Sequence, residues 1–464
     1  MAQHFDLCII GTGSGNSILN EEFDGWSVAI VERGVFGGTC INRGCVPSKM
    51  LIYPADIIES VRHAEVLGVD AFVEEVRWSD IRDRTFARID HIAEAGERYR
   101  REAANVTVFA EDARFVGHKE LRVGDQTITA DQFVLAAGAS THVPSIPGLD
   151  AVPFQTSDTI MRIDEVPERL LVIGGGFIAV EMSHVFDAYG ACVTIVTRGE
   201  HLLRIEDAEI SRRLTERFAE RFDLRLHTTP RRVDLVDGVL RLEVEGPHGV
   251  EVVEGDMLLL ATGRFPNGGQ LNVEATGVTL DLDGYVVTDP AMATATEGIW
   301  ALGDIRNHLQ LKHMANLDAR IVRHNLLHPN QRRTIDERFV PHVVFTSPQI
   351  ASVGLTEQQA EMHGRPFVTA VYDYGSTAYG WALEDTTSCA KLIADVAPRH
   401  LIGAHIIGPQ SSLLLQQLVQ GMRFDLTVDQ MAVEVIYPHP ALSEVVENAL
   451  LDLISALDAA SAVR

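Results

Sequence analysis

Residues 7–16, LCIIGTGSGN, are a short apolar run that leads into a glycine-rich turn. The run predicts a buried parallel strand, and residues 27–31 predict the next strand, which ends at Glu32. A strand, a glycine turn, a helix and a second strand ending in an acid are the fingerprint of a dinucleotide-binding fold. We therefore expect Gly11 to make the tight turn and Gly13 to admit a diphosphate. The helix N-terminus is expected to meet the phosphates, and Glu32 a ribose.

The turn departs from the usual pattern at its third glycine. Asn16 stands at that position, and Gly15 lies one residue earlier. The third glycine of the fingerprint normally lets the helix pack closely against the strand. We therefore expect this packing to differ in the first copy of the fold.

A second copy follows at residues 170–179, LLVIGGGFIA. Gly174, Gly176 and Ala179 fit the fingerprint in the form that ends in alanine, and residues 191–196 predict the strand that follows. Two dinucleotide folds in one chain indicate two bound nucleotides, with a path for electrons between them.

The end of the second strand indicates which nucleotide the second copy binds. This strand runs into Thr197-Arg198 without an acid, and Arg204 follows six residues later. Guanidinium groups bind a 2′-phosphate, which a carboxylate repels. The second copy therefore predicts NADPH in preference to NADH. The alternative is that both arginines are solvated surface residues.

Residues 37–49, GGTCINRGCVPSK, contain two of the five cysteines, Cys40 and Cys45. On an ideal α-helix, residues five apart lie about 8 Å from each other and on different faces. A disulfide needs Cα atoms within about 7 Å, so a bridge requires an irregular turn, which Gly44 permits. Such a strained, locally closed bridge is redox-labile. Two thiols that are merely near each other remain the alternative. No metal site is expected, since paired ligand spacing is missing.

A second chemical group lies near the end of the chain, in residues 437–444, YPHPALSE. His439 stands between two prolines that fix the backbone. Glu444 falls in the first turn of a predicted helix with a packed apolar face (Leu442, Val445, Val446, Ala449, Leu450, Leu453 and Leu457). A carboxylate there can orient the imidazole, as in general acid–base sites. Since the chain has 18 histidines, a structural role for His439 is the alternative.

Composition describes an ordinary globular protein of 464 residues. Lys and Arg number 39 and Asp and Glu 65, a net charge of −26, which argues against nucleic acid or a membrane surface as partner. The N-terminus shows no signal peptide and no apolar run is long enough to span a membrane. An odd number of cysteines suits a reducing compartment. We expect a cytoplasmic protein.

Together these motifs resemble the flavin-linked disulfide reductases, the family of glutathione reductase and dihydrolipoamide dehydrogenase. The likeness covers essentially the whole chain, and residues 37–49 and 439–444 are specific to that family. It implies FAD on the first fold, NADPH on the second and a homodimer with a shared active site. The expected fold class is α/β with two Rossmann-like domains and a C-terminal α+β dimerisation domain. The expected boundaries are 1–145 for FAD, 146–266 for NADPH, 267–337 for a central segment completing the FAD domain, and 338–464 for dimerisation.

The resemblance also implies roles for individual residues. Cys45 is expected beside the flavin, and Cys40 is expected to attack the substrate disulfide after NADPH has reduced FAD and FAD the cysteine pair. Phe177 matches an aromatic lid over the flavin. The expected catalytic residues are Cys40, Cys45, His439, Glu444, Lys49 and Glu181, with Lys49 and Glu181 paired and with His439 and Glu444 donated across the dimer interface. The expected cofactor-binding residues are Gly11, Gly13, Ser14, Gly15, Glu32, Gly38, Thr39, Lys49, Gly138, Asp304, Gly174, Gly176, Phe177, Ile178, Glu181, Arg198, Arg204 and Gly263.

The substrate is expected to be a small disulfide without free carboxylates. Glu21 and Glu22 occupy the place on the first helix where glutathione reductases carry basic residues, and they disfavour an anionic substrate. The glycine turn and residues 41–43, INR, are similar to the branch of the family that acts on a sugar-linked cysteine disulfide. An NAD-linked lipoamide dehydrogenase, a glutathione reductase and a non-catalytic flavin redox sensor are the alternatives.

Overall fold

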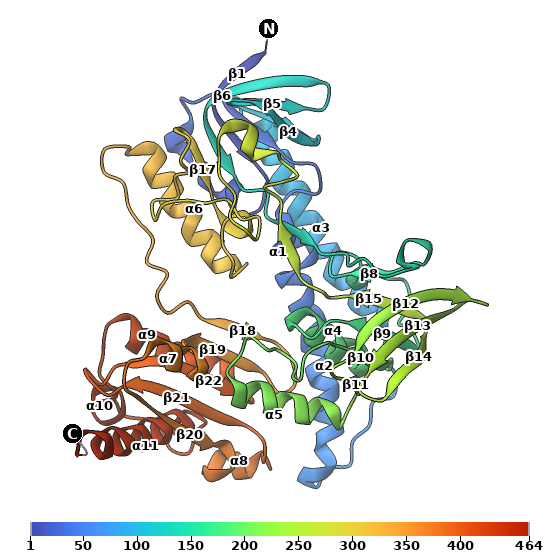
Figure 1. The fold of residues 1–464 in the computed structure, drawn as a ribbon, viewed down its shortest axis with the longest axis vertical. Helices are drawn as coiled ribbons and strands as arrows, with labels where there is room; N and C mark the ends of the chain where they lie inside the picture. The colour runs from blue at the N-terminus through green and yellow to red at the C-terminus, as the bar shows by residue number, and fades with distance from the viewer. Residues whose placement is uncertain (1, 463–464) are drawn as a thin grey trace.

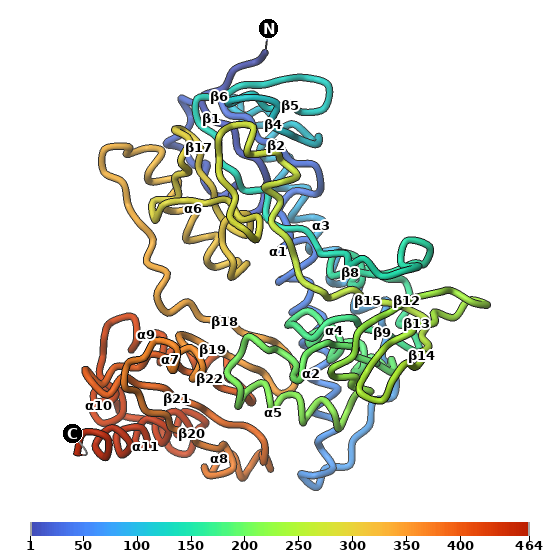
Figure 2. Tube along the Cα trace, viewed as in Figure 1, coloured from blue at the N-terminus to red at the C-terminus, as the bar shows by residue number. Residues whose placement is uncertain are grey.

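The computed structural model describes residues 2–462, which form three lobes (Figures 1 and 2). The upper lobe in Figure 1 is built on a seven-stranded sheet, ordered β3-β2-β1-β6-β5-β4 with β17 beside β6. Parallel pairing joins β3, β2, β1, β6 and β17, while β4 and β5 extend it as an antiparallel hairpin. The strands are β1 (Gln3–Ile10), β2 (Val28–Val31), β3 (Val106–Phe109), β4 (Ala113–Gly117), β5 (Glu120–Val123), β6 (Gln126–Leu135) and β17 (Ile299–Ala301).

The link between β1 and β2 differs from the sequence-based expectation. The predicted α-helix is wrong: residues 11–27 form only two short 3-10 turns, η1 (Ser14–Ile18) and η2 (Glu21–Phe23). Arg100, from α3 (Trp78–Glu102), donates to the backbone carbonyl oxygens of Asn16 and Leu19. Because those carbonyls would accept the next bonds of a growing helix, their capture by a distant guanidinium ends the helix after one turn.

The second lobe contains the second dinucleotide fold. Its five-stranded parallel sheet, ordered β11-β10-β9-β15-β8, is followed by a three-stranded antiparallel sheet, β12-β13-β14. The strands are β8 (Gln155–Thr156), β9 (Arg169–Ile173), β10 (Cys192–Val196), β11 (Asp223–Arg225), β12 (Thr229–Val236), β13 (Val239–Gly246), β14 (Gly249–Gly255) and β15 (Met257–Leu260). The helices are α4 (Phe177–Ala188) and α5 (Ala208–Ala219).

Two segments cross between the first and second lobes. β7 (Ala139–Thr141) follows β6, and β16 (Arg264–Pro266) follows β15. They pair as an antiparallel ribbon. The long helix α2 (Cys45–His63) also joins the lobes, because its buried residues pack in one hydrophobic core with those of α4.

The C-terminal lobe is α+β. Its antiparallel sheet, ordered β18-β19-β22-β21-β20, is covered by helices and follows a link over residues 328–341 (Figure 2). The strands are β18 (His342–Val344), β19 (Ile350–Gly354), β20 (Phe367–Asp373), β21 (Cys389–Asp395) and β22 (Leu401–Ile407). The helices are α7 (Glu357–His363), α8 (Ala378–Ala382), α9 (Ser411–Arg423), α10 (Val428–Val433) and α11 (Ser443–Ala462). The predicted apolar face of α11 is confirmed, since its residues are buried against the sheet.

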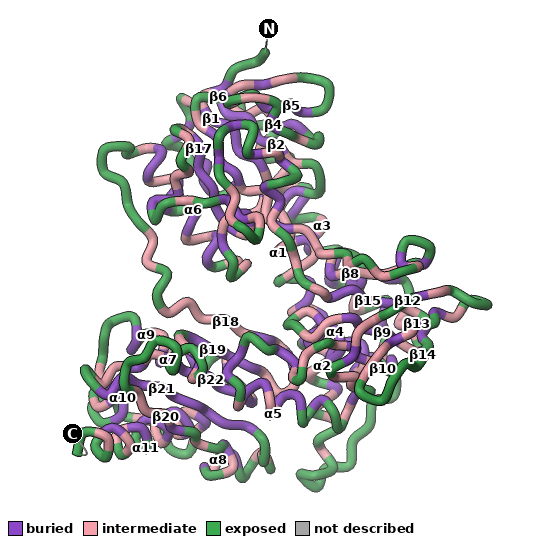
Figure 3. The backbone as a smooth tube through the Cα atoms, in the orientation of Figure 1, coloured by how far each residue is buried: buried purple, intermediate pink, exposed green. Residues whose placement is uncertain are grey.

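Each sheet packs against a buried core (Figure 3), and one further core joins α2 and the second dinucleotide fold to the edge of the C-terminal sheet. The remaining helices are α1 (Gly38–Arg43) and α6 (Lys312–Leu327), the latter packed on η1. Within residues 2–462 no helix combines the length and the apolar character needed to cross a membrane. The four expected domain boundaries stay predictions.

Candidate active site

One cavity of about 1560 Å³ is shared by both dinucleotide folds and closed partly by the C-terminal lobe. Both glycine turns and both cysteines of the redox segment line it. Of the predicted cofactor-binding residues only Gly15 is absent from the lining. The site predicted from separate motifs is therefore one continuous space.

The first glycine turn leaves space along the backbone that side chains would fill. Gly11 has φ +102°, and a Cβ there would lie 2.3 Å from the carbonyl oxygen of Ala136. Gly38 has φ +67°, and its Cβ would lie 2.6 Å from the Cα of Gly13. Glycine is required at both positions. The open backbone between them fits a diphosphate, so the residues present suit FAD.

Gly15 has a packing role in place of the expected third glycine. A Cβ on Gly15 would lie 2.7 Å from that of Ala136. Asn16 is turned outward, where its Oδ1 accepts a hydrogen bond from Arg100 Nε at 2.7 Å. The expectation that packing differs at this point is confirmed.

Glu32 stands at the end of β2 and lines the cavity. One carboxylate oxygen accepts hydrogen bonds from the backbone N–H and the hydroxyl of Thr12, at 2.9 and 2.7 Å. The other accepts the N–H of Gly34 at 2.9 Å. These bonds fix the carboxylate beside the glycine turn, where a ribose of the dinucleotide would meet it.

The second glycine turn leads directly into α4. Gly174 has φ +136°, and a Cβ there would lie 2.2 Å from the carbonyl oxygen of Ala261. Phe177 is the first residue of α4, 48% exposed, and lines the cavity. Arg198 and Arg204 also line it and are exposed, and neither forms an ion pair within residues 2–462. Two free guanidinium groups beside this turn fit the 2′-phosphate of NADPH.

The redox segment breaks into two helices at the predicted glycine. α1 ends at Arg43, Gly44 has non-helical φ and ψ, and α2 begins at Cys45. Both cysteines are free thiols. Hydrogen bonding from the Cys40 thiol lowers the pKa of Cys45 to about 7, helped by the charge of Lys49, and the same interaction raises the pKa of Cys40. In the reduced protein Cys45 is therefore the more acidic of the two thiols.

Lys49 and Glu181 form the ion pair that the resemblance implies, with Nζ 2.8 and 2.9 Å from the two carboxylate oxygens. Glu181 is buried and also accepts the backbone N–H of Phe345 at 2.9 Å. Since Lys49 lies on α2, Glu181 on α4 and Phe345 beyond β18, this carboxylate joins all three lobes at the cavity.

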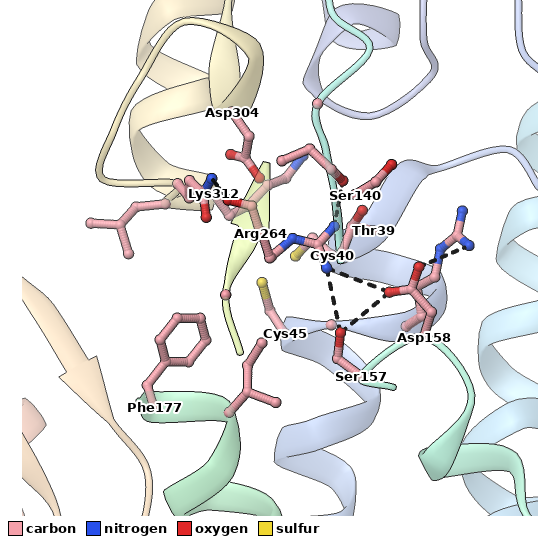
Figure 4. A pocket seen from close by; sticks show the side chains of 18 of the residues that line it. Thr39, Cys40, Cys45, Ser140, Ser157, Asp158, Phe177, Arg264, Asp304 and Lys312 are labelled. Carbon is pink, nitrogen blue, oxygen red and sulfur yellow. Dashed lines mark hydrogen bonds and ion pairs between the residues drawn. The ribbon is translucent and has the colours of Figure 1, made fainter. Parts of the chain in front are cut away.

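Sequence reasoning missed a cluster of charged side chains next to the cysteines (Figure 4). Arg264, 8% exposed, lies 3.5 Å from Asp158, and Arg43 lies 3.3 Å from the same carboxylate. Arg43 stands between the cysteines and so had a local signal, whereas Arg264 did not. Lys312 had none. Burial raises the pKa of Asp304, which lies in the same group of side chains.

His439 and Glu444 are not brought to this cavity within one chain. His439 Nδ1 lies 2.6 Å from Glu444 Oε1, so the predicted pair is present. The imidazole is 72% exposed on the C-terminal lobe, and its hydrogen bond lowers the pKa of Glu444. Glu21 and Glu22 are also exposed, on η2 rather than on a helix, and do not line the cavity. The structure therefore gives no support to the argument that they select the substrate.

Fold and site together define a two-nucleotide disulfide oxidoreductase. Residues 5–319 match the model of the pyridine nucleotide-disulphide oxidoreductase family, and residues 340–450 match its dimerisation domain. The chain belongs to this family. The predicted enzyme class, the use of FAD and NADPH and the α/β fold class with a C-terminal dimerisation domain are thereby confirmed.

Relatives place the chain within the family. It is 45% identical over 462 residues to mycothione reductase of Mycobacterium tuberculosis, covering 97% of this chain and 99% of that enzyme. It is 33% identical to mercuric reductase of Staphylococcus aureus, covering 92% and 78%. The solved structure of the HOCl-induced flavoprotein disulfide reductase RclA from Escherichia coli, a Cu(II) complex, matches with a TM-score of 0.83 at 28% identity, covering 97% and 99%. The resemblance to the branch acting on a sugar-linked disulfide is confirmed.

Proposed function

We propose that this chain reduces mycothione to mycothiol with NADPH, through bound FAD and the Cys40–Cys45 pair. The observation that carries the proposal is that both thiols lie in the wall of the cavity into which both glycine turns open. The 45% identity to mycothione reductase supports the choice of substrate. We place the enzyme in the cytoplasm, where the thiols it produces stay reduced. Each turnover takes one NADPH and one proton and releases NADP⁺ and two thiols.

FAD, when bound, supplies the hydride acceptor that connects NADPH to the disulfide. Gly11, Gly13, Gly38 and Thr39 would hold its diphosphate end, with Glu32, Gly138 and Asp304 along its length. On the second fold Gly174, Gly176, Ile178, Arg198, Arg204 and Gly263 would hold NADPH. Phe177 would cover the place where the nicotinamide enters. Lys49, held by Glu181, keeps a positive charge near Cys45.

The two thiols act in turn on the substrate. Cys40 attacks one substrate sulfur, a mixed disulfide forms, and the first thiol leaves. Cys45, the thiol of lower pKa, then attacks Cys40, which releases the second thiol and restores the Cys40–Cys45 disulfide. Two electrons thus pass from the dithiol to the substrate disulfide.

Cys40 needs a proton acceptor, because the hydrogen bond to Cys45 raises its pKa. We propose that the partner subunit's His439, oriented by Glu444 of that subunit, takes this proton and returns it to the leaving thiol. The exposed imidazole and the dimerisation domain at residues 340–450 support a homodimer with a shared site.

The Cys40→Ser variant tests this assignment. It should keep FAD and its reduction by NADPH but lose mycothione turnover by about 1000-fold or more, since the proposed mechanism assigns the attack on the substrate to Cys40. Cys192→Ser, at an exposed cysteine outside the cavity, is the matched control. A Cys40→Ser enzyme that still turns over mycothione would contradict the role of Cys40.

A panel of disulfides tests the substrate. Purified enzyme with NADPH should reduce mycothione with a higher kcat/KM than glutathione disulfide or lipoamide. Faster turnover of either competitor would identify a glutathione reductase or a lipoamide dehydrogenase. Stoichiometric reduction of the protein without turnover of any disulfide would identify a redox sensor.

A further inference from the structure

The first dinucleotide turn lacks the helix that normally faces a diphosphate. η1 is a single 3-10 turn without a side-chain cap, and Arg100 holds the backbone that would have continued it. The N-terminus of an α-helix attracts phosphate through its free N–H groups and its dipole. A single turn supplies little of this charge, so another group must neutralise a dinucleotide bound here.

Lys312 reaches the same turn from a distant part of the chain. It begins α6, and its Nζ lies 2.8 Å from Ser14 Oγ. The hydroxyl of Ser14 donates in turn to Asn316 Oδ1 at 2.9 Å, one helical turn along α6. Lys312, Ser14 and Gly13 all line the cavity. The serine therefore fixes the ammonium group beside the first glycine turn.

The charge of Lys312 is available to an anion. Among the described residues 2–462 no carboxylate lies within ion-pair distance of its Nζ, whereas Lys49 pairs with Glu181. Figure 4 shows Lys312 next to Asp304. Burial raises the pKa of that carboxyl group, and the positive charges of Arg264 and Lys312 act in the opposite direction.

We propose that Lys312 takes the place of the missing helix N-terminus and binds the diphosphate of the dinucleotide on the first fold. This inference rests on the proposed function, because it takes FAD to be that dinucleotide. Asn316 and Ser14 act as positioning residues, since they hold the lysine beside the turn without supplying charge.

A different role for Lys312 predicts a different result. Its positive charge also lowers the pKa of Cys45. If Lys312 served only the thiolate, its loss would shift the pH at which Cys45 reacts and leave the affinity for FAD unchanged. Binding of FAD and alkylation of Cys45 therefore separate the two roles.

The experiment measures the Kd of FAD from its release on dilution of the holoenzyme, followed by flavin fluorescence. Lys312→Met should raise this Kd about 10-fold or more, because a hydrogen bond from a charged group is lost. Lys312→Arg should restore most of the affinity. Ser14→Ala should weaken binding less, and should add little to Lys312→Met, since both act on one contact.

The matched control is Arg320→Met, which removes a positive charge from an exposed position of the same helix, outside the cavity, and should leave the Kd unchanged. ADP and adenosine identify the group bound. As competitors of FAD rebinding to the apoprotein, ADP should lose affinity in Lys312→Met by the same factor, and adenosine should not.

Equal FAD affinity in wild type and Lys312→Met overturns the proposal, whether or not Cys45 alkylation by iodoacetamide shifts. Equal losses for ADP and adenosine overturn it as well. If Lys312→Met does not fold, Lys312→Gln and Ser14→Ala carry the same comparison. A wild-type enzyme without FAD or without disulfide turnover would instead refute the proposed function, so the two failures are distinct.

Discussion

The two dinucleotide folds of this chain share a strand and a glycine turn but differ in the element that comes after the turn. After β1, Gly11 leads into the short turn η1, whose backbone Arg100 binds from α3. After β9, Gly174 leads into the regular helix α4. In both, a Cβ on the first glycine would lie within 2.3 Å of a carbonyl oxygen at the end of the neighbouring strand.

The comparison shows which part of the dinucleotide-binding motif is indispensable. The close approach of two strand ends requires the first glycine in both copies, whereas the helix after the turn is needed only in the second. We propose that the identity of the nucleotide is encoded elsewhere, by the residues at the end of the second strand. Glu32 stands there in the first fold, and Arg198 follows the strand in the second.

The largest effect is expected from the same substitution made in both folds. Gly11→Ala and Gly174→Ala each place a Cβ against a carbonyl oxygen and force a positive φ, at a cost of about 3 kcal/mol or more. Gly11→Ala should yield protein without FAD, seen in the visible spectrum. Gly174→Ala should keep FAD but lose NADPH oxidation by about 100-fold in kcat/KM.

Gly96→Ala is the control for these variants, since a Cβ there meets nothing within 4 Å. It should leave FAD content and activity unchanged. Normal FAD content in Gly11→Ala would show that the first glycine is not required in both turns.

The next effect concerns the residues after the second strand. Replacing both Arg198 and Arg204 with Ala should lower kcat/KM for NADPH about 100-fold, because each charge-assisted bond contributes about 1.5 kcal/mol. The kcat/KM for NADH should change by less than about threefold from wild type, since NADH lacks the 2′-phosphate. Arg232→Ala, at an exposed pair with Asp234, is the control. Equal losses with both nucleotides would contradict the assignment.

A smaller effect tests the contact between the folds, the Lys49–Glu181 pair. The pKa of Cys45 is lowered from 9.0 to about 7, so its thiolate forms as pH rises through 7 rather than 9. The rate of Cys45 alkylation in the reduced protein should therefore rise with pH, with its midpoint at about 7. Lys49→Met should move it to higher pH, since a stabilising positive charge is lost. Glu181→Gln should move it to lower pH, because the charge of Lys49 is no longer offset. If the pH dependence of Cys45 alkylation were unchanged in both variants, the Lys49–Glu181 pair would have no effect on the Cys45 thiolate.

The smallest effect concerns the turn that replaces the first helix. Asn16→Ala removes the side-chain bond to Arg100 and should lower the free energy of unfolding by about 1–2 kcal/mol, measured by urea denaturation. Asn20→Ala, at an exposed residue whose side chain bonds to Glu22, should change it by less than about 0.5 kcal/mol. An equal change in both variants would show that Asn16 does not organise the turn.

Much of the fold and the candidate site could be predicted because the signals are local. The apolar runs ending in Gly11 and Gly174 indicated both strands, and the spacing of the cysteines indicated a break at Gly44. The C-terminal lobe is α+β as expected, although no strand was predicted at β19 or β22 and no helix at α8 or α10. Their short apolar runs give no clear periodicity.

The first helix and the charged cluster could not be predicted in the same way. Residues 11–27 carry a helix fingerprint, and the group that ends the helix is Arg100, 84 residues away in the chain. Lys312 lies 298 residues from Ser14, and nothing near it in the sequence indicates a binding role. Glu21 and Glu22 were expected on that helix and lie on η2 for the same reason.

The class of this protein follows from short stretches of its sequence, namely two glycine turns, a cysteine pair five residues apart and a histidine between two prolines. Each depends on the backbone freedom or chemistry of a few adjacent residues. Only the tertiary structure decided how the charges meet, as in the pair of Lys49 with Glu181 and the contact of Lys312 with Ser14. Charged groups interact through space over a few ångströms, and only folding brings residues from distant segments that close.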